Sequence, residues 1–130
     1  MIAVVGMPGS GKSEFVNIAL NFGYRFISMG DIVREETVKR GYPLEESGKV
    51  AQMLRDKEGL DAIAILTLDK IRETHDDKFL IEGIRGIMEI ERFRDEIDCF
   101  LVGIHTSPRL RFERLKNRER EDDPETFEEF

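Results

Sequence analysis

The 130-residue sequence has little of several residue types, and each shortage excludes a class of protein. Its single cysteine, Cys99, allows neither an intramolecular disulfide nor a metal site built from several cysteines, so a reducing, cytoplasmic location is expected. No apolar run approaches the ~20 residues that span a bilayer, and the N-terminus has no signal-peptide pattern. We therefore expect no association with a membrane.

An excess of positive charge is missing as well. The formal net charge is −7, and residues 119–130 hold seven acidic residues against one arginine. The remainder of the chain is nearly neutral and has no general basic face. Affinity for phosphate backbones comes from clustered Lys and Arg, so nucleic acid is not an expected partner.

What the sequence does contain is enough apolar material for one core, with 40% hydrophobic residues and nine Phe. Short apolar runs alternate with longer helical patterns, which predicts an α/β fold with a parallel sheet flanked by helices, in a single domain over 1–130. The predicted strands are Ile2–Val5, Arg25–Ser28, Lys78–Glu82 and Asp98–His105. The predicted helices are Gly11–Asn21, Asp31–Arg40, Leu44–Lys57, Asp61–Glu73, Ile87–Glu96 and Pro108–Arg118.

The motif GMPGSGKS follows the first predicted strand directly. It fits G-x-x-x-x-G-K-[ST], in which backbone N–H groups surround phosphate oxygens, the lysine reaches the outer phosphates and the hydroxyl meets Mg²⁺. A glycine-rich turn that merely joins strand to helix would not need both the lysine and the hydroxyl. The motif predicts an ATP-binding P-loop made of Gly6, Met7, Pro8, Gly9, Ser10, Gly11, Lys12 and Ser13.

The second half of such a site is an acid at the end of a neighbouring strand. Glu82 follows the apolar run Phe79–Ile81 and precedes Gly83. We interpret Ser13 and Glu82 as the Mg²⁺ ligands, and the alternative for Glu82 is an ordinary charged residue at a strand end.

Three further segments resemble adenylate kinases. They are ISMGDIVREE, with Arg34; FLIEGIRG, with Arg85; and FERLKNRE, with Arg114 and Arg118 four residues apart. The segments GMPGSGKSEF, SMGD and DDPETFEEF resemble, more closely, those of an archaeal adenylate-kinase-related group. The sequence departs from adenylate kinases in having Glu82 in place of Asp and no Pro before Arg85.

This resemblance implies a P-loop kinase that transfers the γ-phosphoryl group of Mg·ATP to a nucleoside monophosphate, AMP first. It implies that Lys12, Arg85, Arg114 and Arg118 are catalytic and that Gly30, Asp31, Arg34 and Arg85 bind the acceptor. It also implies a helical monophosphate-binding insertion near 30–58 and an incomplete lid near 119–130. The C-terminal strand and helix of such kinases are not found in the sequence.

Two other functions remain open from the residues alone. One is a small-molecule hydroxyl kinase of the dephospho-coenzyme-A kinase type, in which Asp31 is the candidate base. The other is a non-catalytic nucleotide-binding regulator. Asp31 also suits a helix N-cap, Arg34 can pair with Asp31, and Arg114 and Arg118 can belong to a solvated helix face.

Overall fold

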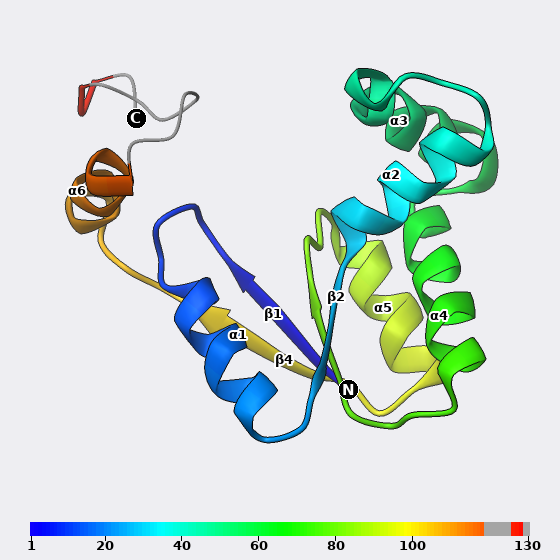
Figure 1. The fold of residues 1–130 in the computed structure, drawn as a ribbon, viewed down its shortest axis with the longest axis horizontal. Coiled ribbons are helices and arrows are strands. Elements are labelled where there is room, and N and C mark those ends of the chain that lie inside the picture. The colour runs from blue at the N-terminus through cyan, green and yellow to red at the C-terminus, as the bar shows by residue number, and fades with distance from the viewer. Residues whose placement is uncertain (119–125, 129–130) are drawn as a thin grey trace.

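A four-stranded parallel sheet forms the centre of the computed structural model, which describes residues 1–118 and 126–128 (Figure 1). The strands are β1 (Ile2–Gly6), β2 (Arg25–Ser28), β3 (Phe79–Glu82) and β4 (Phe100–Ile104). Their order in the sheet is β2-β3-β1-β4. After β1 the chain forms β2 at one edge, and β3 then fills the position between β2 and β1. In such sheets ligands bind at the carboxyl ends of the strands, where the order reverses.

The helices occupy the connections between these strands. α1 (Lys12–Asn21) joins β1 to β2, α5 (Ile87–Glu96) joins β3 to β4, and α6 (Pro108–Arg118) follows β4. The β2–β3 connection is much longer. It contains α2 (Met29–Lys39), the 3₁₀ turn η1 (Leu44–Glu46), α3 (Ser47–Glu58) and α4 (Ala62–Thr74).

The alternation of side chains along β3 explains why helices cover both faces of the sheet. Phe79 and Ile81 belong to a core that also contains residues of α2, α3, α4 and α5. Leu80 points to the other face, where it clusters with Ala19 of α1. Successive side chains of a strand point to opposite faces, so an uninterrupted apolar run is what a doubly covered strand requires. The α/β architecture predicted from the sequence is therefore confirmed.

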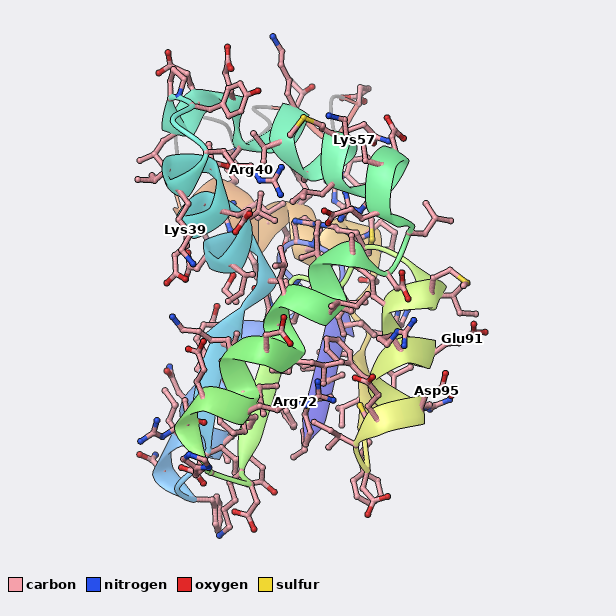
Figure 2. All side chains as sticks on the ribbon, turned by 90° about the vertical axis from the view of Figure 1, so that its right-hand side faces the viewer. Lys39, Arg40, Lys57, Arg72, Glu91 and Asp95 are labelled. Carbon is pink, nitrogen blue, oxygen red and sulfur yellow. The ribbon has the colours of Figure 1, made fainter. Side chains whose placement is uncertain are left out.

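Charged side chains project from the outer surface of the helical layer. In Figure 2, the labelled residues come from the end of α2, the position after it, and α3, α4 and α5, and all six are exposed. They are Lys39, Arg40, Lys57, Arg72, Glu91 and Asp95. Within the described residues, no helix has the length and apolar character needed to cross a membrane.

The boundaries of the elements differ from the predicted ones in two informative places. The predicted helix Leu44–Lys57 is split, because Leu44–Glu46 forms a 3₁₀ turn before α3 begins at Ser47. Pro43 enters this turn in an extended conformation, and the Ser47 hydroxyl donates a hydrogen bond to the Leu44 carbonyl oxygen at 2.7 Å. α2 begins at Met29, two residues before the predicted start at Asp31, because Ser28 rather than Gly30 is the extended N-cap residue.

Candidate functional site

The loop between β1 and α1 has the backbone shape of a P-loop. Gly9 has φ 79°, and a Cβ atom there would lie 2.8 Å from the carbonyl oxygen of Arg111. A Cβ atom on Gly6 would lie 2.6 Å from Ser10 Oγ. That hydroxyl oxygen is buried without a hydrogen-bond partner in the described structure. The loop therefore needs glycine at both places, and an unpartnered hydroxyl inside it suits a polar ligand such as phosphate.

The connection between β4 and α6 fastens this loop from one side. The Thr106 hydroxyl donates a hydrogen bond to the Ser10 carbonyl oxygen at 2.8 Å. The guanidinium of Arg114 donates to the Gly9 carbonyl oxygen at 3.1 Å, and Arg111 Nε donates to the Thr106 carbonyl oxygen at 3.1 Å. The sequence singled out Arg114 but not Thr106, which carries no motif of its own. The structure brings Arg114 to the P-loop.

Two of the predicted nucleotide-site residues, Lys12 and Glu82, lie close together at the carboxyl ends of neighbouring strands. Lys12 Nζ lies 3.7 Å from Glu82 Oε1, and the Ser28 hydroxyl donates to Glu82 Oε2 at 3.4 Å. Glu82 is only partly buried, and Ser13 is exposed in the first turn of α1. Mg²⁺ uses one or two carboxylates with water and substrate phosphates, so this donor set fits it. The assignment of Ser13 and Glu82 as Mg²⁺ ligands stays a prediction.

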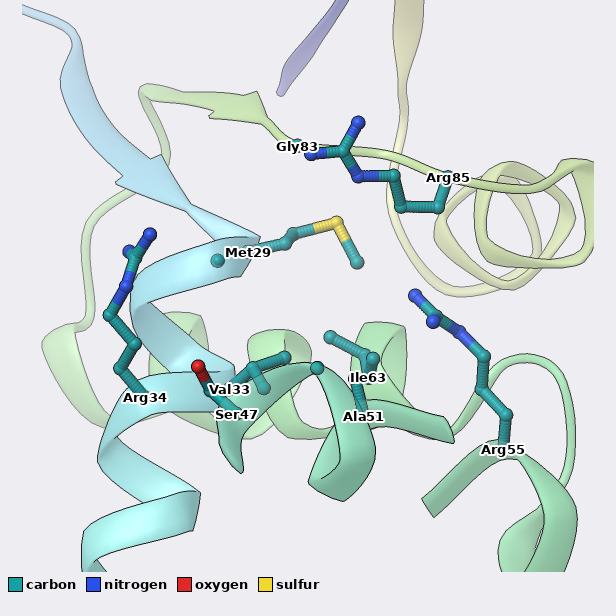
Figure 3. A pocket seen from close by; sticks show the side chains of 11 residues that line it. Met29, Val33, Arg34, Ser47, Ala51, Arg55, Ile63, Gly83 and Arg85 are labelled. Carbon is teal, nitrogen blue, oxygen red and sulfur yellow. The ribbon is translucent and has the colours of Figure 1, made fainter. Parts of the chain in front are cut away.

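A pocket of about 400 Å³ opens beside the end of β3, and we call it the α2–α3 pocket (Figure 3). Its apolar wall includes Met29, Val33, Ala51 and Ile63. Three arginines also line it, which are Arg34 of α2, Arg55 of α3 and Arg85 of the loop after β3. The remaining lining residues are Gly30, Ser47, Gly48 and Gly83. The structure thus places Arg34, Arg85 and Gly30 around one cavity, while their role as acceptor ligands stays a prediction.

Asp31 is placed differently from the other predicted acceptor residues. Its side chain is 67% exposed, and its carboxylate accepts a hydrogen bond from Arg34 on the helix surface. Asp31 is not among the residues that line the α2–α3 pocket. The structure therefore shows the Asp31–Arg34 pair that the sequence left open.

The remaining predicted residues lie near the C-terminal end of the described chain. Arg118 is the last residue of α6 and is exposed. Of the predicted lid near 119–130, positions 119–125 and 129–130 lie outside the described residues.

The sequence did not single out Arg55, which lines the α2–α3 pocket, or Glu89. Arg55 also lines a second cavity of about 350 Å³, together with Arg85 and Glu89. Arg55 lies at helical spacing from Ser47 and Ala51, which also line the α2–α3 pocket, but no sequence motif marks these three residues. The capping pattern Gly86-x-x-Glu89 at the start of α5 would have pointed to Glu89.

The sheet order, the helices on both faces and the glycine-shaped loop together define a P-loop NTPase-type domain. The comparisons with known proteins agree with this class. Residues 5–130 match the AAA domain family. A UPF0200 protein of Thermococcus sibiricus is 45% identical over 138 residues, which cover 100% of this chain and 72% of the relative.

Two further relatives place the chain more narrowly. A UPF0200 protein of Methanocaldococcus jannaschii is 46% identical over 134 residues, covering 100% of this chain and 68% of the relative. A UPF0200/UPF0201 protein of Archaeoglobus fulgidus is 45% identical over 135 residues, covering 99% of this chain and 42% of the relative. The chain belongs to the UPF0200 protein family. The names of these relatives state no substrate, so the closer likeness to adenylate kinases remains a proposal.

Proposed function

We propose that the protein transfers the γ-phosphoryl group of Mg·ATP to a nucleoside monophosphate, with AMP as the first candidate. The observation that carries this proposal is that the P-loop and the α2–α3 pocket lie on either side of the end of β3. Lys12 lies 3.7 Å from Glu82, and the next residue along the chain, Gly83, lines the pocket together with Arg34 and Arg85. A phosphate donor and an anionic acceptor would therefore bind next to each other.

The chemistry of the pocket suits an acceptor that is already a phosphate. Such an acceptor is an anionic nucleophile and needs no general base, so catalysis consists mainly of positioning and charge neutralisation. Asp31, the candidate base for a hydroxyl acceptor, pairs with Arg34 and does not line the pocket. This arrangement favours phosphate over hydroxyl as the accepting group.

The predicted charged residues other than Asp31 all have a role in this proposal. Arg34 and Arg85 hold the acceptor phosphate through their guanidinium forks. Lys12 binds the outer phosphates of ATP, and Arg114, already at the P-loop, neutralises charge that develops on the transferred group, together with Arg118. Ser13 and Glu82 would hold Mg²⁺, which would supply positive charge at the ATP phosphates.

Calorimetric titration of AMP into the wild-type protein, Arg34→Ala and Arg85→Ala tests the proposal. A hydrogen bond to a charged group contributes about 1.5–3 kcal/mol, so each variant should bind AMP roughly tenfold or more weakly and keep its ATP affinity. Arg40→Ala is the matched control, because Arg40 directly follows the same helix but pairs with Glu36 and does not line the pocket.

Two results would contradict the proposal. One is equal AMP affinity in the wild type and both pocket variants. The other is a wild-type protein that does not bind AMP but binds and phosphorylates dephospho-coenzyme A. That result would show that the protein is a hydroxyl kinase. Nucleotide binding without turnover on any acceptor would instead support a regulator.

A further inference from the structure

A buried carboxylate contacts two of the three arginines that line the α2–α3 pocket. Glu89, in the first turn of α5, is 1% exposed. Its Oε1 atom accepts hydrogen bonds from the backbone N–H groups of Arg85, at 2.7 Å, and Gly86, at 3.0 Å. Glu89 therefore fixes the backbone of the residue whose guanidinium lines the pocket.

The second oxygen of the same carboxylate is differently placed. Glu89 Oε2 is buried and has no hydrogen-bond partner in the described part of the chain. It lies 3.8 Å from Arg55 Nη2, a distance that allows an ion pair but is too long for a hydrogen bond. The Arg55 side chain is 21% exposed, and it lines both the α2–α3 pocket and the second cavity.

Because Glu89 is buried, its carboxylate has a strong requirement for nearby positive charge. An ionised carboxylate out of water needs nearby compensation, which the N-terminus of α5 supplies on one side and the Arg55 guanidinium on the other. Arg55 is consequently held close to Glu89 by charge, while its fork retains N–H donors for another partner. Figure 3 shows Arg55 pointing toward Arg85 and into the pocket, on the side opposite Arg34.

We propose that Glu89 is a positioning residue that orients both Arg85 and Arg55, and that Arg55 is a third arginine that binds the acceptor. The inference rests on the proposed function, because it adds a residue to the same acceptor site. It requires an acceptor with two groups that accept hydrogen bonds. One is the phosphate between Arg34 and Arg85, and the other is an oxygen or ring nitrogen of the nucleoside that Arg55 reaches.

Three variants separate the parts of this arrangement. Glu89→Gln keeps an oxygen for the backbone N–H groups but loses the charge that orients Arg55. Arg55→Lys keeps the charge beside Glu89 but loses the planar fork. Glu89→Ala loses both contacts. Glu96→Gln is the matched control, because Glu96 lies at the other end of α5 and its carboxylate pairs with Arg72 and Arg92.

AMP and ATP affinities by calorimetry and amide hydrogen exchange at Arg85 and Gly86 are the measurements. Glu89→Gln should bind AMP several-fold more weakly, and Arg55→Lys roughly tenfold more weakly, with ATP affinity unchanged in both. Exchange at the two amides should stay slow in these variants and become fast only in Glu89→Ala. If Glu89 had a purely structural role, its substitution would lower thermal stability and weaken AMP and ATP binding to the same extent. The control should bind both ligands as the wild type does.

Wild-type AMP affinity in both Glu89→Gln and Arg55→Lys would overturn the inference, even if Glu89→Ala fails to fold. A turnover assay with ATP and AMP separates this failure from that of the proposed function. If the wild type binds AMP but transfers no phosphoryl group to it, and Arg55→Lys weakens the AMP affinity, the kinase proposal falls and the role of Arg55 as a ligand of the nucleotide stands. If the wild type does not bind AMP, both proposals fall.

Discussion

The guanidinium of Arg114 donates a hydrogen bond to the carbonyl oxygen of Gly9, 3.1 Å away, and so connects α6 to the P-loop. These two residues are 105 positions apart in the sequence. The same guanidinium would lie 3.6 Å from a Cβ atom built on Gly11. Arg114 thus lies at the phosphate-binding loop, near two of its glycines.

Arg114→Ala should therefore lower turnover at saturating ATP by on the order of a hundredfold, as expected for loss of a charged donor near the transferred group. Thermal stability should change little, because Arg114 is exposed. Steady-state kinetics and thermal unfolding of the same preparations check both statements. Arg109→Ala, an exposed position on the same helix, is the control. Unchanged turnover in Arg114→Ala would exclude a catalytic role.

The P-loop and the strand ends could be predicted from the sequence because they depend on local patterns. The motif from Gly6 to Ser13 fixes its own geometry, and the apolar run before Glu82 identifies a buried strand whose end lies beside the P-loop. Arg25–Ser28 and Ile87–Glu96 were predicted with the boundaries that the structure has. In each case, the residues that determine the structure are neighbours in sequence.

The contacts that were missed depend on how separate elements pack. Arg55 meets Glu89 only because α3 and the start of α5 lie on the same side of the sheet, and no local pattern encodes that approach. Thr106 bonds Ser10 across 96 positions. For Asp31 the sequence left open both a place in the acceptor site and a pair with Arg34, and the structure shows that pair on the helix surface, with Asp31 not among the residues that line the pocket.

His75 ends α4 in a left-handed backbone conformation, with φ 55° and ψ 21°. This conformation costs a non-glycine residue roughly 1–2 kcal/mol, and glycine would avoid that cost. Glycine also makes the unfolded chain more flexible, which offsets part of the gain. His75→Gly should therefore raise the free energy of unfolding by up to about 1 kcal/mol in urea titrations. Glu73→Gly, inside the same helix, should lower it by about 1 kcal/mol. A loss of stability in His75→Gly would contradict the strain argument.

Asp76 links the starts of β2 and β3. Its carboxylate accepts hydrogen bonds from the backbone N–H groups of Asp77 and Lys78 and pairs with Arg25 at 3.0 Å. The backbone hydrogen bonds, from Asp77 and then Lys78, are the main cause that lowers the pKa of Asp76 below its usual value, and the charges of Arg25 and Lys78 add to the effect.

A carboxylate whose pKa is lowered by folding stabilises the protein above its unfolded pKa, and this stabilisation disappears as the pH falls through the folded value. Asp76→Asn should therefore flatten the acid side of the stability profile while changing its slope little at neutral pH. Urea unfolding between neutral and acidic pH measures the difference. Asp77→Asn, at the next and exposed position, is the control. Parallel profiles for Asp76→Asn and the wild type would contradict this prediction.

Lys12 is the residue on which nucleotide binding by the P-loop depends most directly. Its ammonium group lies 3.7 Å from Glu82 Oε1, and a compact positive charge at that place would meet the outer phosphates of ATP. Lys12→Ala should lower ATP affinity or turnover by about tenfold or more, because it removes a positive charge that would meet the outer phosphates. Lys70→Ala is the matched control, since Lys70 is an exposed lysine that pairs with Glu35 on the helical layer. Calorimetry with ATP and a coupled turnover assay distinguish binding from chemistry. If Lys12→Ala binds and turns over ATP as the wild type does, the P-loop is not the nucleotide site and the kinase proposal has no donor.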